Sequence, residues 1–305
     1  MTDITEVITR LTTEGPDDRL RLAATWLTEH PDLVATLSKR EVAKRAGVTI
    51  DDLERLAARL SLIGYADLRA IYRREMSNSP EGTWYSSGVI LKGGETKTNK
   101  PAREWLNEVF VSSMDNLEES FAANSESIVT AANLILDAEN ENIHILGWRS
   151  CFSVAYLLNY TYRMFRGNGR LVTDPGEAGE DELRWLKPGD VLIAISVEPY
   201  TAEIIRATQY ALERGARIIA ITDNEQSPLA RLAAVALYAE NVTPSFFHSM
   251  AALVSLVEAL ASLVFILAGP EGLRGIEHSE NHLSYFKPYL SPTDPTERSS
   301  KQRGT

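Results

Sequence analysis

Two short segments place hydroxyl groups and charges directly after runs of apolar residues. Residues 147–151 (GWRSC) end one run at 143–147, and residues 196–201 (SVEPYT) end another at 191–196. In an open sheet of parallel strands, ligands bind in the crevice at the carboxyl ends of the strands. Hydroxyls beside backbone N–H groups at a helix start bind phosphate, whereas a carboxylate such as Glu198 binds the hydroxyls of a sugar. The two segments therefore predict a site for a small, oxygen-rich ligand.

Catalysis would need further groups beside such a site. Glu258 or His248 could act as a base near a sugar carbon, but the sequence pairs neither with a second catalytic group. Cys151 is the only cysteine, which rules out an internal disulfide. A thiol at a helix start can be reactive, although we favour a packed substitute for serine. No metal-ligand cluster is apparent, so we predict no catalytic residue, no metal site and no cofactor.

Helices and strands alternate in the part of the chain that would position these groups. Five short runs rich in Ile and Val, without in–out alternation, occur at 143–147, 171–173, 191–196, 218–222 and 235–239. Strands buried on both faces have this composition. We therefore predict an α/β fold with a mainly parallel five-stranded sheet flanked by helices. Apolar spacing predicts earlier helices at 19–30, 37–47, 49–61, 65–76 and 102–138.

Residues 37–69 have the layout of a helix-turn-helix. Ser38 is placed to cap a first helix, Gly47 provides a sharp turn, and Thr49 is placed to cap a second helix. The leucines that bury the second helix are Leu53, Leu56 and Leu60. On these residues alone, a plain helical hairpin is an equal alternative.

The same segment resembles the N-terminal domain of the MurR/RpiR family of transcriptional regulators. The family positions kept here are Leu37, Ser38, Arg40, Glu41, Ala43, Ala46, Gly47, Val48, Arg55, Leu60, Gly64, Tyr65, Leu68 and Arg69. The resemblance implies an all-α helix-turn-helix head that binds double-stranded DNA. The residues that it implies for DNA binding are Ser38, Lys39, Arg40, Lys44, Thr49, Arg55 and Arg59.

The second helix of this head departs from the family in charge. It begins with Asp51, Asp52 and Glu54, where the family has small or hydroxyl residues. Acids in a first turn suit the helix dipole, but we expect these three to face the DNA, where phosphates repel them. Residues 1–77 carry 12 Lys and Arg against 13 Asp and Glu. The head therefore lacks the basic patch typical of nucleic-acid binding.

The α/β half resembles the SIS (sugar isomerase) domain that follows the head in the same family. The matching stretches are IHILGWRSCFSVA, GDVLIAISVEPYTAE, RGARIIAITDNEQSPLARLA and TPSFFHSMAALVSLVEAL. SIS domains bind phosphosugars at the strand ends, so the resemblance implies an effector site there. Its residues would be Gly147, Arg149, Ser150, Cys151, Ser196, Glu198, Thr201 and His248.

The phosphate-binding loops also depart from the family. They resemble G-x-G-S-S and S-x-S-x-x-S/T, but Arg149 replaces the second glycine, Cys151 the second serine and Glu198 the central serine. A carboxylate beside a phosphate is unfavourable unless something neutralises it. Either Arg149 pairs with Glu198, leaving an ion pair or a pocket that still takes an anion, or the effector is not an ordinary phosphosugar. We favour the second alternative; a degenerate, empty site is a third.

Composition fits a two-domain globular protein of 305 residues with a net charge of −11. The N-terminus lacks the apolar core of a signal peptide, and Glu258 interrupts the apolar run at 250–268, which we interpret as a buried helix. We expect a cytoplasmic protein without a membrane partner. The predicted parts are a helix-turn-helix domain at 1–77, a linker and connecting helix at 78–120, a SIS domain at 121–290 and a flexible tail at 291–305.

Together these observations predict a DNA-binding transcriptional regulator of carbohydrate metabolism rather than an enzyme. Its expected partners are a double-stranded DNA operator, a small sugar-like effector, and further copies of itself in a homodimer or higher homo-oligomer. Two alternatives stay open. One is a SIS-type sugar isomerase or lyase, and the other is a ligand-binding protein that has lost DNA binding.

Overall fold

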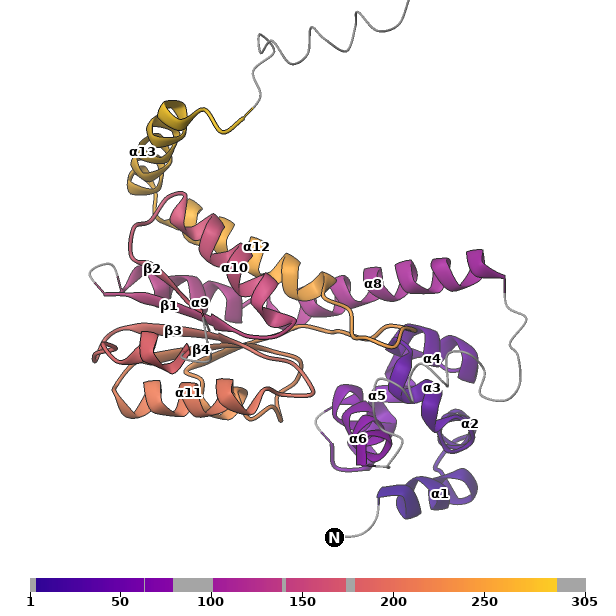
Figure 1. Ribbon diagram of the computed structural model, residues 1–305. Coiled ribbons are helices and arrows are strands. Elements are labelled where there is room, and N and C mark those ends of the chain that lie inside the picture. The colour runs from indigo at the N-terminus through magenta and orange to yellow at the C-terminus, as the bar shows by residue number, and fades with distance from the viewer. Residues whose placement is uncertain (1–3, 63, 79–100, 139–140, 174–178, 290–305) are drawn as a thin grey trace, which may run out of the picture.

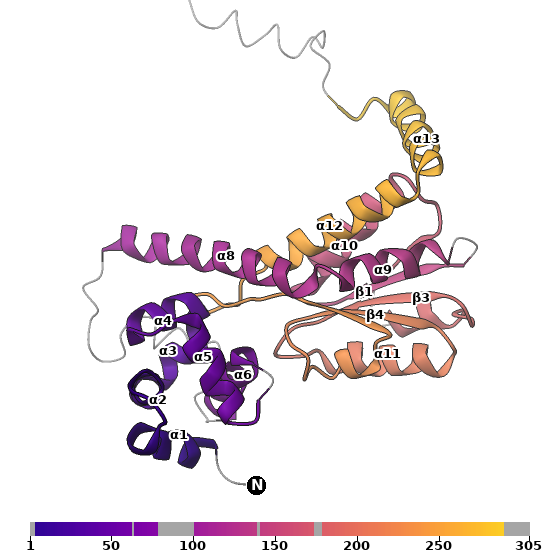
Figure 2. The same cartoon turned by 180° about the vertical axis from the view of Figure 1, so that it is seen from behind.

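A computed structural model describes residues 4–62, 64–78, 101–138, 141–173 and 179–289. A helical head and a layered α/β body lie at either side of one long helix (Figures 1 and 2). Residues 79–100 of the predicted linker and connecting helix at 78–120 fall outside the described residues, as does the predicted tail at 291–305. The predicted domain boundaries stay predictions.

Within the described residues the head contains six helices. They are α1 (Ile4–Glu14), α2 (Asp18–Glu29), α3 (Pro31–Thr36), α4 (Lys39–Ala46), α5 (Ile50–Arg59) and α6 (Tyr65–Asn78). The predicted helices α2, α4, α5 and α6 are confirmed, whereas α1 and α3 were not foreseen. Pro31 ends α2 but also begins α3, because proline lacks the N–H that a first helical turn leaves unpaired.

A tight turn between α4 and α5 gives the helix-turn-helix its shape. Gly47 ends α4 with a left-handed φ of 70°, a conformation that glycine adopts without a steric cost. Thr49 then begins α5 in a capping box, in which its hydroxyl and the carboxylate of Asp52 each accept a backbone N–H. Leu53 and Leu56 are fully buried and join the head core. The predicted helix, turn and helix are therefore present.

The body contains a five-stranded sheet in the order β2-β1-β3-β4-β5, with every neighbouring pair parallel. The strands are β1 (Ile143–Gly147), β2 (Gly169–Val172), β3 (Val191–Ile195), β4 (Arg217–Thr222) and β5 (Val235–Tyr238). All residues of β1 and β3 are buried, as expected of strands covered on both faces. The predicted parallel sheet is confirmed.

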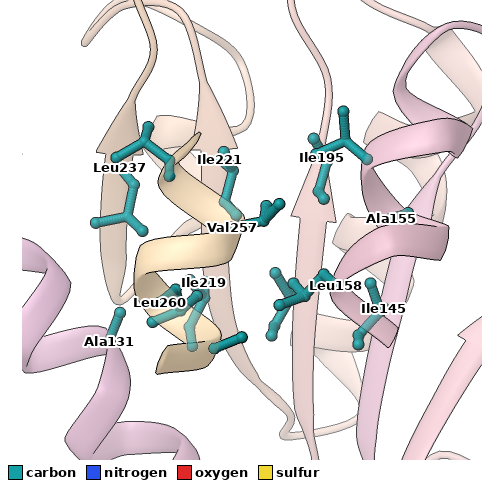
Figure 3. Close-up of a cluster of buried hydrophobic side chains, with 14 of the residues drawn as sticks. Ala131, Ile145, Ala155, Leu158, Ile195, Ile219, Ile221, Leu237, Val257 and Leu260 are labelled. Atoms are coloured by element: carbon teal, nitrogen blue, oxygen red, sulfur yellow. The ribbon is translucent and has the colours of Figure 1, made fainter. Parts of the chain in front are cut away.

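Helices cover both faces of this sheet (Figure 1). One face carries α9 (Ser127–Leu136), α10 (Cys151–Arg163) and α12 (Ala251–Leu267), and the other carries α11 (Ala202–Glu213). Figure 3 shows Val257 and Leu260 of α12 against Ile219 and Ile221 of β4. The apolar run that we interpreted as a buried helix is therefore largely core.

The long helix α8 (Ala102–Asn124) connects the head to the body, and α13 (Pro270–Phe286) extends from the end of α12. Four polar side chains of α8 contact the chain around and after β5. Among them, Ser112 and Asn116 both donate to the carbonyl of Val242, at 2.8 and 2.6 Å. Among the described residues no single helix is long and apolar enough to cross a membrane; α12 and α13 pass that test only as a pair bent by 111°.

Candidate functional site

The strand order places two loops side by side at the carboxyl edge of the sheet. The order changes direction between β1 and β3, which is where doubly wound α/β folds bind ligands. The register pairs Gly147 at the end of β1 with Ile195 at the end of β3. The loop before α10 and the loop before α11 therefore leave the sheet next to each other. These are the two segments that the sequence indicated.

The first loop makes a close turn into α10. A Cβ on Gly147 would lie 2.7 Å from the carbonyl oxygen of Cys151, so only glycine lets this helix start so near the strand. Arg149 has a left-handed φ of 55° and an exposed side chain. Ser150 follows it, and its hydroxyl lies 3.4 Å from Nε2 of His248. The structure thus brings together Ser150 and His248, which are far apart in the sequence.

Cys151 and Trp148 of the same loop point into the protein. Cys151 is buried in the same apolar cluster as Val197 of the second loop. Burial raises the pKa of the Cys151 thiol, so the group is neutral near pH 7. Trp148 joins the core between the sheet and α11. Both side chains hold the loops in place, and neither behaves as a reactive or stacking group.

The second loop is held by a buried carboxylate. Asp223, which follows β4, accepts a hydrogen bond from the Tyr200 hydroxyl at 2.8 Å and from the backbone N–H of Glu198 at 3.3 Å. Asn224 donates to the Tyr200 hydroxyl at 3.0 Å. Burial, reinforced by the negative charge of Asp223, raises the pKa of Tyr200 and keeps its hydroxyl protonated. Thr201 begins α11, and its N–H donates to the hydroxyl of Ser196.

This network gives Asp223 a larger role than the sequence indicated. Neither Asp223 nor Tyr200 was among the predicted site residues. Asp223 instead fixes the loop that carries Glu198. The position of Asp223 at a strand end was visible in the sequence, but its contact with a tyrosine 23 residues earlier was not.

The two loops place opposite charges at this edge of the sheet. Glu198 is half-buried and Arg149 is exposed. The edge therefore offers hydroxyls, a carboxylate and a guanidinium. The described residues include no group of three or more His, Cys, Asp or Glu that could hold a metal ion.

Most of the predicted DNA-binding residues in the head make internal contacts. Ser38 donates to Asp115 of α8 at 2.6 Å, and Arg40 pairs with Asp115 at 2.9 Å. Lys39 pairs with Glu54 at 2.8 Å. Two further predicted residues have internal partners of the same kind: Thr49 bonds to Asp52, and Arg55 pairs with Asp52 and Asp17. Lys44 and Arg59 are exposed, and Lys44 has only a 3.5 Å contact with Glu41.

The expectation that three acids of α5 face DNA is wrong for two of them. Asp52 is only 3% exposed, because its carboxylate closes the capping box and pairs with Arg19. Glu54 turns back to accept the N–H of Tyr65. Asp51 alone is exposed. The acids of α5 thus mainly stabilise the head.

Comparisons with known proteins agree with this fold. A model of the SIS domain matches residues 135–263, a range that includes both loops and His248. The body of this chain is a SIS domain. An uncharacterized HTH-type transcriptional regulator of Caldanaerobacter subterraneus is 24% identical over 299 residues, covering 94% of this chain and 99% of that protein.

Two solved structures share the fold. The sugar isomerase domain of an RpiR transcription factor from Sphaerobacter thermophilus has a TM-score of 0.55 at 24% identity, over 58% of this chain and 99% of that one. The NanR protein of Vibrio vulnificus, complexed with ManNAc-6P, has a TM-score of 0.56 at 18% identity, over 94% of this chain and 100% of that one. The predicted resemblance to regulators with a helix-turn-helix head and a SIS domain is confirmed.

Proposed function

We propose that this chain is a DNA-binding transcriptional regulator of carbohydrate metabolism whose SIS domain binds a sugar or a sugar derivative. One observation carries the proposal: a capped helix-turn-helix and a SIS domain with two polar strand-end loops occur in one chain. Its similarity to an HTH-type regulator extends over nearly the whole length of both proteins. A regulator needs both parts, since one reads DNA and the other senses the effector.

For the effector, the groups at the sheet edge favour a ligand rich in hydroxyls. Ser150, Thr201 and His248 supply polar groups, and Glu198 supplies a carboxylate that can accept from sugar hydroxyls or an amine. The NanR complex supports a sugar derivative as the ligand of this fold. Because a carboxylate repels a phosphate, we infer that the site disfavours a phosphate placed beside Glu198.

For DNA, we propose that the head binds through the start of α4 and through α5, with Lys44 and Arg59 as its freely exposed cations. Two copies would read two half-sites. The apolar side chains exposed along α8, including Phe110 and Phe121 at 63% and 76%, support a homodimer. A cytoplasmic location follows from the proposed role.

The alternative of a SIS-type isomerase or lyase rests on the body alone. His248 lies beside Ser150, but the neutral, buried Cys151 offers no nucleophile. An isomerase would also leave the head without a purpose. We therefore propose that the chain is not an enzyme.

The test uses the purified full-length chain and the DNA upstream of its own coding region. A gel shift that a sugar or sugar phosphate reverses or strengthens supports the proposal. The same compounds are then incubated with the protein and analysed by NMR. Turnover of a phosphosugar without any DNA binding would establish the enzymatic alternative instead. Effector binding without DNA binding would identify a ligand-binding protein that has lost its DNA contact.

A further inference from the structure

The start of α4 is occupied by two carboxylates of the long helix α8. The Ser38 hydroxyl donates to one oxygen of Asp115 at 2.6 Å, and the Arg40 guanidinium donates to the other at 2.9 Å. The same guanidinium donates to Glu118 at 2.8 Å. Ser38 and Arg40 belong to the head, whereas Asp115 and Glu118 lie 75 or more residues later.

Asp115 presents its two oxygens as a DNA phosphate would. In a helix-turn-helix the first helix crosses the DNA backbone, and phosphates are bound by hydroxyls, guanidinium groups and helix N-termini. Asp115 makes two of these kinds of contact, with a hydroxyl and with a guanidinium, at the N-terminus of α4, where Ser38 is the capping residue. A phosphate and the Asp115 carboxylate cannot occupy this position together.

We propose that α8 acts as an internal competitor of the DNA backbone, so that Asp115 and Glu118 hold the head in a conformation that binds DNA weakly. The proposal rests on the proposed function, since it assumes that the head binds DNA. It deepens that function by assigning an autoinhibitory contact to named residues. Release of α4 from α8 is then the step that exposes Ser38 and Arg40 to phosphate.

The contact is a built interface between the head and the body. Asp115 is 3% exposed, so its charge is buried and depends on Ser38 and Arg40 for compensation. Two further ion pairs flank it: Arg45 of α4 with Glu108 of α8 at 3.2 Å, and the buried Arg69 of α6 with Glu240 after β5. Two head helices, α4 and α6, are thus bound to α8 and to the segment after β5.

The carboxylates also lie on a helix that contacts the effector half of the chain. Ser112, three residues before Asp115, and Asn116, directly after it, both donate to the carbonyl of Val242. The chain continues from there to Ser249, whose N–H donates to the carbonyl of Asn241, and to His248 beside Ser150. A ligand that moves His248 would therefore displace the segment around Val242, to which α8 is hydrogen-bonded.

The experiment compares the full-length chain with the double variant Asp115→Asn and Glu118→Gln. Binding to a mixed-sequence DNA duplex is measured by fluorescence anisotropy, because phosphate contacts determine sequence-independent affinity. We expect the variant to bind about ten-fold more tightly, the effect of losing one strong competing contact. The matched control is Glu104→Gln with Glu126→Gln, which removes two exposed charges near or on α8 without touching α4.

Unchanged or weaker DNA binding by the double variant, in a protein that binds DNA when unaltered, would overturn the autoinhibitory contact and leave the proposed function standing. An equal gain in the control would also overturn it, since the effect would then be general charge repulsion. Failure of every protein to bind DNA would defeat the proposed function as well.

The single variant Glu118→Gln provides a second test in case the double variant misfolds. The Glu118 side chain is 66% exposed, so its replacement leaves the buried Asp115 contact in place. Thermal unfolding followed by circular dichroism checks that the fold is kept. We expect a gain in DNA affinity of about two-fold, in keeping with a surface ion pair. A folded variant with no gain would count against the proposal.

Discussion

The two helices of the helix-turn-helix, α4 and α5, differ in their side-chain caps from α10 and α11, the two helices that follow the site loops. In the head, Ser38 caps α4 and Thr49 caps α5, and both hydroxyls are also bonded to carboxylates. In the body, α10 begins at Ser150 and α11 at Thr201, and neither side chain makes a capping hydrogen bond. A helix start that lacks a side-chain cap leaves its N–H groups available to a ligand. The comparison favours an open effector site in the body and a head whose contacts DNA must first displace.

Loss of the capping box at α5 should have the largest effect on the head. Asp52→Ala removes the carboxylate that pairs the N–H of Thr49 and the charge that faces Arg19 and Arg55. We expect the head to lose about 3 kcal/mol of stability, from the lost cap and the unpaired donors. Chemical denaturation of the full-length chain measures this. The control Asp51→Ala, at an exposed neighbour, should change stability by less than about 0.5 kcal/mol.

The same carboxylate gives the head a defined response to acid. The backbone N–H of Thr49 lowers the pKa of Asp52, so the group stabilises the head above the ordinary aspartate pKa. That stability is lost as the pH falls through the lowered pKa of the folded state. Asp52→Asn should therefore flatten the acid limb of a stability-against-pH curve. An unchanged acid limb would mean that Asp52 is not closed in the capping box in solution.

In the body, the substitution with the largest expected effect is at Gly147. Gly147→Ala would bring a Cβ to 2.7 Å from the Cys151 carbonyl, and backbone atoms cannot yield as a flexible side chain can. We expect α10 to shift, with a loss of about 2 kcal/mol in stability and loss of effector binding. Gly167→Ala is the matched control, because a Cβ at that position meets no atom within 4 Å. Retained effector affinity in Gly147→Ala would show that the first loop does not form the site.

Glu198→Ser tests what kind of ligand the open edge accepts. Removing the half-buried carboxylate should raise the affinity for sugar phosphates by about ten-fold, because a group that repels phosphate disappears, while free sugars lose a hydrogen-bond acceptor. Calorimetry with a panel of hexose and hexosamine phosphates and the free sugars measures both changes. Glu203→Ser, in the first turn of α11, is the control for charge alone. Equal changes in both variants would place Glu198 outside the binding site.

The sequence predicted the sheet well because buried parallel strands leave a local signature. The Ile- and Val-rich runs match all five strands to within a few residues. The partner of a polar side chain, by contrast, is not determined by the residues next to it in the sequence. The spacing of Thr49 and Asp52 is that of a capping box. Their place at the start of the second helix nevertheless favours the interpretation that the acids Asp51, Asp52 and Glu54 face DNA.

Contacts between distant segments could not be foreseen from the sequence at all. No pattern links Ser38 to Asp115, or Tyr200 to Asp223, because these pairs exist only once the head packs on α8 and the strands align. The site residues that the resemblance implied lie at the predicted edge. The groups that position those residues emerged only from the fold.

The smallest expected effect concerns such a positioning group. Tyr200→Phe removes the hydroxyl that donates to Asp223 and accepts from Asn224, but keeps the ring. The loss of two hydrogen bonds in this partly buried network should loosen the loop that carries Glu198 and weaken effector binding about five-fold, with little change in unfolding temperature. Tyr210→Phe, on α11 beside Arg214, removes a hydroxyl outside this network and should leave effector affinity unchanged. If Tyr200→Phe binds the effector as tightly as the unaltered chain, the buried Asp223 contact does not position the loop. The open helix starts would then suffice for binding, and the contrast between head and body would rest on capping alone.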